Sequence, residues 1–241
     1  MNCIVLIATA LAAPDDWIVP ELGKGEPWTP WLGVAMSVFG IYALGTSGLI
    51  LCESLVAKVR DREAILNFVK WKGSESVLDV GCGRGLMLVG AARRLTTGRA
   101  TDVDIWARKD KALHKKSAPA ENARAEGKGK RGGVETADMR KLPFANLQFD
   151  VVVSDCAVHK LKSKAYRLQA IIEMDRVLRP NEVILLSDII NRNESVAAFQ
   201  SLGFADVRLI VLSPVKDRLF TLVSFGFFRP ATVVARRHLS R

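Results

Sequence analysis

Glycines alternate with other residues in the stretch VLDVGCGRG, which runs from Val77 to Gly85 and begins with a short apolar run. Glycine lets a backbone take positive φ and approach a ligand closely. A helix that starts directly after such a turn offers unpaired N–H groups to a carboxylate or phosphate. Asp104 lies nineteen residues beyond Gly85, where a carboxylate can accept hydrogen bonds from ribose hydroxyls. This spacing predicts a site for an adenosine-bearing ligand.

The turn departs from the pattern of dinucleotide-binding proteins, which is GxGxxG. A fingerprint that begins at Gly81 needs its third glycine where this chain has Leu86. Asp79 would repel a pyrophosphate but suits an ammonium group. An amino acid joined to adenosine therefore fits better, and a nicotinamide-dependent reductase is the less favoured enzyme.

Alternating strand and helix patterns surround this turn and must position its residues. Short apolar runs predict strands over Ser76 to Val80, Ala100 to Val103, Val134 to Ala137, Phe149 to Ser154, Val183 to Ser187, Val207 to Leu212 and Leu219 to Phe227. Helical spacing predicts helices over Glu53 to Lys70, Leu86 to Leu95, Lys164 to Leu178 and Glu194 to Leu202. The alternation predicts an α/β fold with a Rossmann-like, doubly wound, mostly parallel seven-stranded sheet.

Four motifs occur in order: VLDVGCGRG, ATDVDIW (Ala100 to Trp106), ADMRKLPFANLQFDVVVSD (Ala137 to Asp155) and RVLRPNEVILLSD (Arg176 to Asp188). They resemble the motifs of class I S-adenosylmethionine-dependent methyltransferases, most closely the type 11-like group that includes quinone-biosynthesis and other small-molecule enzymes. The resemblance covers roughly residues 61–228. It implies S-adenosyl-L-methionine as cofactor and methyl transfer to a small or lipophilic acceptor.

The resemblance also assigns cofactor-binding roles to matching positions. They are Asp79, Gly81, Cys82, Gly83, Gly85, Asp104, Ile105, Asp138, Met139 and Ser154. It implies that Asp79 and the glycine turn hold the methionine part, that Asp104 binds the ribose, and that Asp138 accepts from the adenine amino group. Ile105 would pack near adenine, and Met139 would supply a backbone contact. Cys82 is interpreted as a small filler rather than a nucleophile.

A general base for the acceptor can come from the segment after the strand that ends at Ser154. Oxygen and nitrogen acceptors need such a base, whereas carbon or thiol acceptors need none. Asp155 and His159 are the candidates; a surface role is the competing interpretation of His159. The four cysteines and three histidines are scattered without metal-ligand spacing, so no metal site is predicted.

Two positions depart from the family pattern. Asp102 stands where a small residue is usual, and strand alternation puts it on the same face as Asp104. The two carboxylates would repel and weaken ribose binding unless the strand ends between them. Asn181 and Glu182 replace the usual glycine pair, and asparagine tolerates the left-handed backbone of such a turn.

The segment from Trp31 to Cys52 has 22 residues and no charge. A helix of that length reaches about 33 Å, enough to cross the hydrocarbon core of a bilayer. One basic residue, Lys24, precedes it closely, and five follow within twenty residues: Lys58, Arg60, Arg62, Lys70 and Lys72. This asymmetry predicts a single-pass anchor with the main domain on the cytoplasmic side. A buried core helix is the alternative.

We therefore expect an apolar and polar segment over residues 1–30, a transmembrane helix over 31–52, a methyltransferase domain over 53–230 and a basic tail over 231–241. Residues 1–13 are interpreted as an imperfect signal peptide or a shallow membrane insert. Residues 107–133 carry nine basic and three acidic residues, which favours a solvated segment or a patch for anionic lipid.

The expected protein is a membrane-anchored methyltransferase whose partners are a membrane and a small-molecule or lipid-like acceptor. The net charge of +10 does not by itself choose among anionic partners. Nucleic acid is disfavoured because the basic segment lacks interleaved aromatic residues. A membrane-tethered binding protein that keeps the fold without catalysis is the alternative.

Overall fold

The computed structural model describes residues 29–52, 57–105 and 132–237 and divides into two compact units, Met1–Ala57 and Lys58–Arg241. In the first unit, α3 (Thr29–Cys52) contains the window Trp31–Gly48, whose mean hydropathy is 1.3. By length and composition this helix can cross a membrane, a test that a signal sequence or the core helix of a soluble protein also passes. The predictions for residues 1–13 and for the basic residues between 107 and 133 fall outside the described residues.

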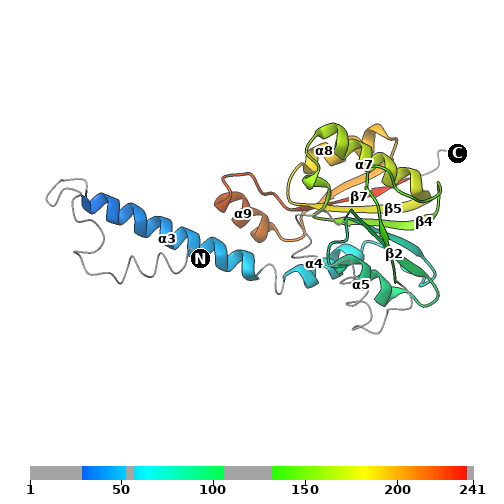
Figure 1. The fold of residues 1–241 in the computed structure, drawn as a ribbon, viewed down its shortest axis with the longest axis horizontal. Coiled ribbons are helices and arrows are strands. Elements are labelled where there is room, and N and C mark those ends of the chain that lie inside the picture. Colours follow the sequence, from blue (N-terminus) through cyan, green and yellow to red (C-terminus); the bar gives the residue numbers. More distant parts are fainter. Residues whose placement is uncertain (1–28, 53–56, 106–131, 238–241) are drawn as a thin grey trace. The chain divides into compact units, whose positions relative to one another are not determined.

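The second unit is built on a seven-stranded sheet with the order β3-β2-β1-β4-β5-β7-β6 (Figure 1). The strands are β1 (Ser76–Val80), β2 (Arg99–Asp104), β3 (Gly132–Thr136), β4 (Phe149–Asp155), β5 (Leu178–Asp188), β6 (Asp206–Ile210) and β7 (Ala231–Arg236). The first five pair in parallel, and β7 is antiparallel to both its neighbours. The predicted doubly wound, mostly parallel sheet is confirmed.

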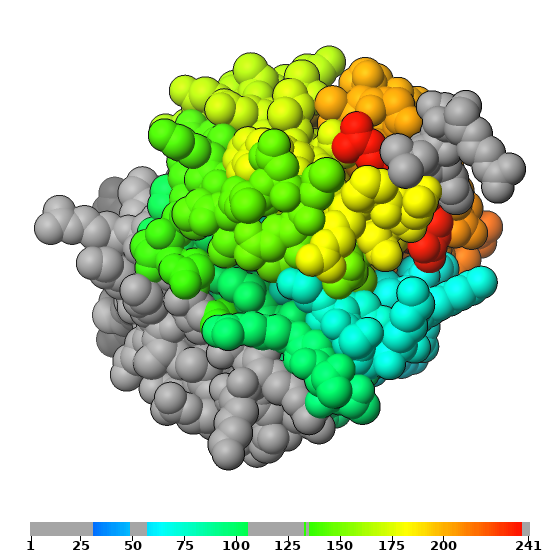
Figure 2. All heavy atoms as spheres, turned by 90° about the vertical axis from the view of Figure 1, so that its right-hand side faces the viewer, coloured from blue at the N-terminus to red at the C-terminus, as the bar shows by residue number. Residues whose placement is uncertain are grey.

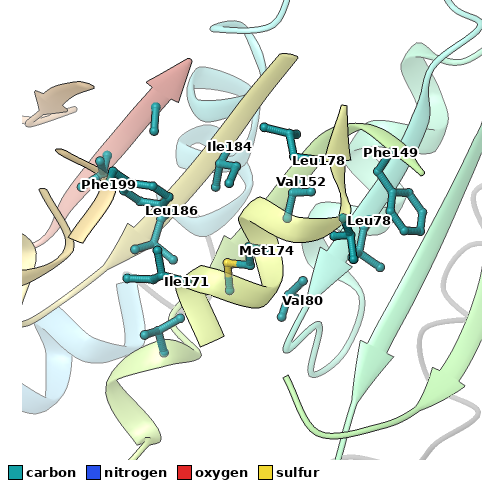
Figure 3. Close-up of a cluster of buried hydrophobic side chains, with 14 of the residues drawn as sticks. Leu78, Val80, Phe149, Val152, Ile171, Met174, Leu178, Ile184, Leu186 and Phe199 are labelled. Atoms are coloured by element: carbon teal, nitrogen blue, oxygen red, sulfur yellow. The ribbon is translucent and has the colours of Figure 1, made fainter. Parts of the chain in front are cut away.

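Helices cover both faces of this sheet. Successive strand residues point to opposite sides, and the apolar ones on each side are buried against helices. The helices α4 (Lys58–Leu66) and α5 (Leu86–Arg94) pack with Val77 of β1 on one face. The helices α7 (Lys164–Val177) and α8 (Arg192–Ser201) pack with Leu78 and Val80 on the other (Figure 1). In Figure 3, Ile171 and Met174 of α7 lie among strand residues of this second cluster.

The amino ends of the parallel strands are closed by polar contacts. Arg179 Nη1 pairs with Asp150 Oδ1 at 2.6 Å, and Arg236 Nη2 donates to Phe68 O at 2.6 Å. Figure 2 views this end, where the segment after α4 (cyan), the start of β4 (green), β5 (yellow) and β7 (red) lie side by side. A functional site therefore belongs at the opposite, carboxyl ends of the strands.

Two predicted elements near the end of the chain are wrong. Leu219 to Phe227 is not a strand, because α9 (Pro214–Val223) occupies most of it. Proline at the start of α9 and Ser213 Oγ, which accepts from Lys216 N at 3.3 Å, begin that helix. Residues 231–236 are not a tail but β7, whose residues Ala231–Ala235 are buried between β5 and β6.

Asn181 takes the expected left-handed backbone, with φ of 64°, but it lies within β5 and not in a separate turn. We predict that Asn181→Ala destabilises the domain by about 1 kcal/mol, because a Cβ without a local polar group disfavours this conformation. Asn181→Gly should stay within about 0.5 kcal/mol of the parent. Thermal unfolding of the detergent-solubilised chain measures both, and an alanine variant as stable as the glycine variant would contradict the prediction.

Candidate active site

The turn after β1 fits closely against the segment after β4. Gly81 has φ of +76°, and a Cβ built on it would lie 2.3 Å from the Cβ of Ala157. Its N–H donates to Val103 O at 2.8 Å, which ties the turn to β2. Any larger residue would push the two segments apart, so a glycine is required at this position.

The carboxylates of Asp79 and Asp104 each accept a hydrogen bond from a backbone N–H of the glycine turn or of the helix that follows it. Asp79 is 1% exposed, and its Oδ2 accepts from Leu88 N at 2.9 Å at the start of α5. Asp104 Oδ2 accepts from Gly83 N at 3.0 Å. A Cβ on Gly83 would meet nothing within 4 Å, so the backbone here borders open space. The turn thus presents its main chain to a ligand beside two acidic groups.

A third carboxyl group, that of Asp102, lies in the same cluster. Asp79 and Asp102 are register partners on β1 and β2, and β2 continues to Asp104, so the predicted shared face of Asp102 and Asp104 is confirmed. Asp102 is 0% exposed, and neither of its side-chain oxygens meets hydrogen-bond geometry with a partner among the described residues. The cluster therefore concentrates acidic groups in a buried position.

Burial and mutual repulsion keep protons in this cluster. Burial raises the pKa of Asp102 from 3.8 to about 8; the charge of Asp104 adds to the rise, and the nearby Cys82 thiol offsets part of it. Burial, followed by the charge of Asp102, raises the pKa of Asp79 well above its ordinary value. The same burial, with Asp79 beside it, raises the pKa of the Cys82 thiol. A thiol held protonated is a filler and not a nucleophile.

The carboxyl end of β4 is joined to the end of β1 and then turns sharply. Ser154 is 1% exposed, and its hydroxyl donates to Val80 O at 2.8 Å. Cys156 has φ of 51° and donates its N–H to Ser187 O at 2.9 Å. Burial raises the pKa of Asp155, while the Ser187 hydroxyl offsets part of the rise. This left-handed residue directs the chain toward Ala157 and the glycine turn.

His159 is paired with Asp188, a residue that the sequence reasoning did not single out. His159 lies in the short helix η3 (Val158–Lys160), and its Nδ1 contacts Asp188 Oδ1. Its backbone N–H donates to Asp188 Oδ2 at 2.9 Å, and Ile189 N donates to Oδ1 at 2.8 Å. The sequence did contain a signal for Asp188, because this residue ends the motif Arg176 to Asp188. It therefore lies at the carboxyl edge of the sheet, where ligand-binding sites are found.

The residues expected around adenine are arranged less simply. Asp138 accepts from Arg140 Nε at 3.0 Å through both oxygens, and the Arg140 interaction lowers the pKa of Asp138. The Arg140 guanidinium also stacks 4.5 Å from the centre of the Tyr166 ring. Met139 lies near Gly81, since its Cε would be 3.2 Å from a Cβ there, and Ile105 is 55% exposed. The structure thus places Met139 beside the glycine turn, whereas both carboxylate oxygens of Asp138 already accept hydrogen bonds from Arg140.

Asp102 provides a test of the carboxyl cluster. Its raised pKa means that the folded chain holds a proton which the unfolded chain releases between about pH 4 and pH 8. Its contribution to stability is therefore complete below pH 4 and is lost as pH rises through 8. We predict that Asp102→Asn is more stable relative to the parent at about pH 8.5 than at about pH 5.5, by about 3 kcal/mol. Thermal unfolding at both pH values measures this.

The half-buried carboxylate of Asp206, which pairs with Arg208 at 3.1 Å, supplies the control. Asp206→Asn should leave the pH dependence unchanged, because Asp206 lies on the edge strand β6, outside the buried carboxyl cluster. If Asp102→Asn and the parent lose stability in parallel as pH rises, the buried proton is not held at Asp102.

Comparison with known proteins supports the interpretation of this site. Residues 78–186 match the family model described as "Methyltransferase domain". The "Probable methyltransferase ltbC" of Aspergillus luteorubrus is 30% identical over 124 residues, which are 51% of this chain and 42% of that protein. The chain thus spans less than half the length of this curated relative.

Solved structures share the fold. A SAM-dependent methyltransferase from Aquifex aeolicus is similar with a TM-score of 0.56 and 18% identity, over 73% of this chain and 88% of that one. Geranyl diphosphate C-methyltransferase from Streptomyces coelicolor A3(2), solved with S-adenosyl-L-homocysteine, is similar with a TM-score of 0.58 and 14% identity, over 74% and 78%. The sequence motifs, the matched residues 78–186 and the shared fold together make this chain similar to S-adenosylmethionine-dependent methyltransferases.

Proposed function

We propose that the chain transfers the methyl group of S-adenosylmethionine to a small or lipophilic acceptor, and that it does so at a membrane. The observation that carries the catalytic part is the glycine turn. Its backbone is pressed against Ala157 and lies between Asp79 and Asp104. The turn stands at the carboxyl ends of β1 and β4, where the strand order switches direction.

The residues of the turn fit this cofactor by charge and by shape. Asp79 and Asp102 hold protons in the free chain, and a ligand that brings ammonium and sulfonium charges would favour their ionised forms, whereas a pyrophosphate would oppose ionisation. The open space at Gly83 allows a close approach to the main chain. When bound, the cofactor supplies an activated methyl group, so the protein's task is mainly alignment.

We assign the chain's own residues to parts of the cofactor on this basis. Asp79 and the turn Gly81, Cys82, Gly83 and Gly85 would hold the methionine part, and Asp104 the ribose. Ser154, which fastens β4 to β1, would form the floor below the sulfonium. Ile105, Met139 and Asp138 would surround the adenine. Since Arg140 already engages both oxygens of Asp138, an adenine amino group would share an oxygen with Arg140.

His159 is the proposed general base for an oxygen or nitrogen acceptor. A carboxylate that accepts from Nδ1–H holds the imidazole in the tautomer whose Nε2 can take a proton. Asp188 is 6% exposed and also accepts from two backbone N–H groups, so it is held firmly in that role. Asp155 is the second candidate base, since burial raises its pKa toward the range in which a carboxylate can accept a proton.

The membrane part of the proposal is supported by α3. This helix can span a bilayer by length and composition, and the basic residues after it favour a cytoplasmic catalytic domain. The Streptomyces protein, which has a similar fold, is a geranyl diphosphate C-methyltransferase. An acceptor with an apolar tail is consistent with an enzyme anchored next to lipid.

Cofactor binding can be tested directly by calorimetric titration of the detergent-solubilised chain with S-adenosylmethionine. We expect saturable binding that Asp104→Ala weakens by about 10- to 100-fold, because ribose hydrogen bonds to a carboxylate are lost. Asp206→Ala, which removes an acid at the far end of the sheet, should bind as the parent does. No binding by the folded parent would favour a membrane-tethered protein that keeps the fold without catalysis.

The general base has a separate test. Asp188→Asn should lower kcat by about 10²- to 10⁴-fold while leaving the KM for S-adenosylmethionine unchanged, since it disturbs the tautomer of His159 but touches no cofactor group. His159→Gln should have a similar effect. Transfer of labelled methyl groups into a membrane extract measures both rates. Unchanged rates would point to a carbon or thiol acceptor that needs no base.

A further inference from the structure

The helix α9 presents its apolar face to the outside of the domain. Val215 is 76% exposed and Leu222 74%, and Leu219 lies between them on the same face, at 38%. None of the residues of α9 is buried. The opposite face carries the less exposed residues Asp217, Phe220 and Thr221, and it faces the protein, because Asp217 pairs with Arg192 at 3.3 Å. A helix of a soluble domain normally has the reverse arrangement.

The end of α9 places a large aromatic residue where glycine is favoured. Phe225 N donates to Leu222 O at 3.2 Å and Gly226 N to Thr221 O at 2.6 Å, which is the hydrogen-bond pattern of a Schellman motif. Phe225 thus takes the left-handed position with φ of 52°, and it is 90% exposed. Both its backbone conformation and its exposure to water are unfavourable for a bulky residue. Phe227 extends the apolar surface at 65% exposure.

We call Val215, Leu219, Leu222, Phe225 and Phe227 the apolar lip. Its charged surroundings are basic: Arg218 and Arg229 are exposed in the same segment, and Asp217, the one acid between residues 214 and 229, is turned toward Arg192. Apolar side chains flanked by cations suit a surface that offers acyl chains beneath anionic headgroups.

The apolar lip lies next to the proposed site. Residues 211–230 connect β6 to β7 and contain α9. Thr232 of β7 is in register with Ile210 of β6 and Ser187 of β5. The helix α9 therefore lies at the carboxyl end of β5 (Figure 1). Arg229 N donates to Ile189 O at 2.7 Å, one residue beyond Asp188. Lys216 also pairs with Asp61 of α4. An occupant of the apolar lip would therefore border the acceptor side of the site.

We propose that the apolar lip inserts into the headgroup and upper acyl region of a phospholipid bilayer that contains anionic lipid, so that a lipophilic acceptor reaches His159 from the membrane. This inference rests on the proposed function, because it assumes that methyl transfer takes place at the membrane. The domain begins at Lys58, only a few residues after α3 ends at Cys52. If α3 spans a bilayer, this short connection gives the apolar lip a high effective concentration near the same bilayer.

The test uses the full chain in nanodiscs of phosphatidylcholine and phosphatidylglycerol that contain a phospholipid with a diazirine in its acyl chain. After photolysis, mass spectrometry identifies the labelled peptides. We expect label in α3 and in the peptide that contains residues 215–227. The variant L222S/F225G should lose label from that peptide by about tenfold, because two large side chains no longer partition into hydrocarbon, and should keep it in α3.

Leu147 supplies the matched control, since it is also apolar, 47% exposed and left-handed at φ of 55°, but precedes β4 at the other end of the sheet. L147G should leave the labelling unchanged. Label in α3 but not in 215–227 would overturn the inference while the anchor stands. Label in 215–227 without α3 would support the lip and overturn the anchor.

Discussion

The close approach of two loops controls the geometry of the whole site. Gly81 after β1 and Ala157 after β4 leave no space for a Cβ between them, and the Ser154 hydroxyl on Val80 O ties the strands that carry them. Because β1 and β4 are the neighbours at which strand order reverses, everything attached to either loop converges there. The glycine turn arrives from one side with Asp79 below it, and His159 arrives from the other with Asp188 behind it. Loosening this one contact would separate the cofactor side of the site from the acceptor side.

The sequence was sufficient for the parts of the molecule in which local pattern and tertiary packing agree. The strand Ser76–Val80 was predicted with its observed bounds, since apolar residues bounded by a glycine turn can hardly form anything else. The region from Leu219 to Phe227 was misjudged because its apolar residues were assumed to be buried, and a run that faces outward breaks that assumption. The tail prediction for residues 231–241 rests on Arg236, Arg237 and Arg241 and overlooks the apolar run ATVVA, which forms most of β7. The pair of Asp188 with His159 depends on where separate elements end, which spacing along the chain does not reveal. The pair of Arg140 with Asp138 is local and depends on the conformation of the loop between β3 and β4.

The acidic cluster contains a buried carboxyl group, that of Asp102, whose burial next to the glycine turn is unfavourable for folding. Asp102 has no hydrogen-bond partner for its side-chain oxygens among the described residues and is held in its neutral form by burial. A neutral carboxyl group in this position costs less than an ionised one, but still more than an apolar residue of similar size. A ligand that brings positive charge to the turn would lower the pKa values of Asp79 and Asp102 together. Binding of such a ligand would therefore be coupled to proton release through these two residues.

The residue at the carboxyl end of α9 has a consequence for how this chain and its relatives can diverge. Selection for a stable fold alone would replace Phe225 by glycine, which relieves the left-handed strain and removes an exposed ring in a single step. Keeping the bulky residue therefore costs stability that glycine would restore, and insertion of the ring into a bilayer would offset that cost. Relatives that have abandoned an apolar segment before the domain are free to make that replacement. The identity of one residue would then distinguish lineages that work at a surface from those that work in solution.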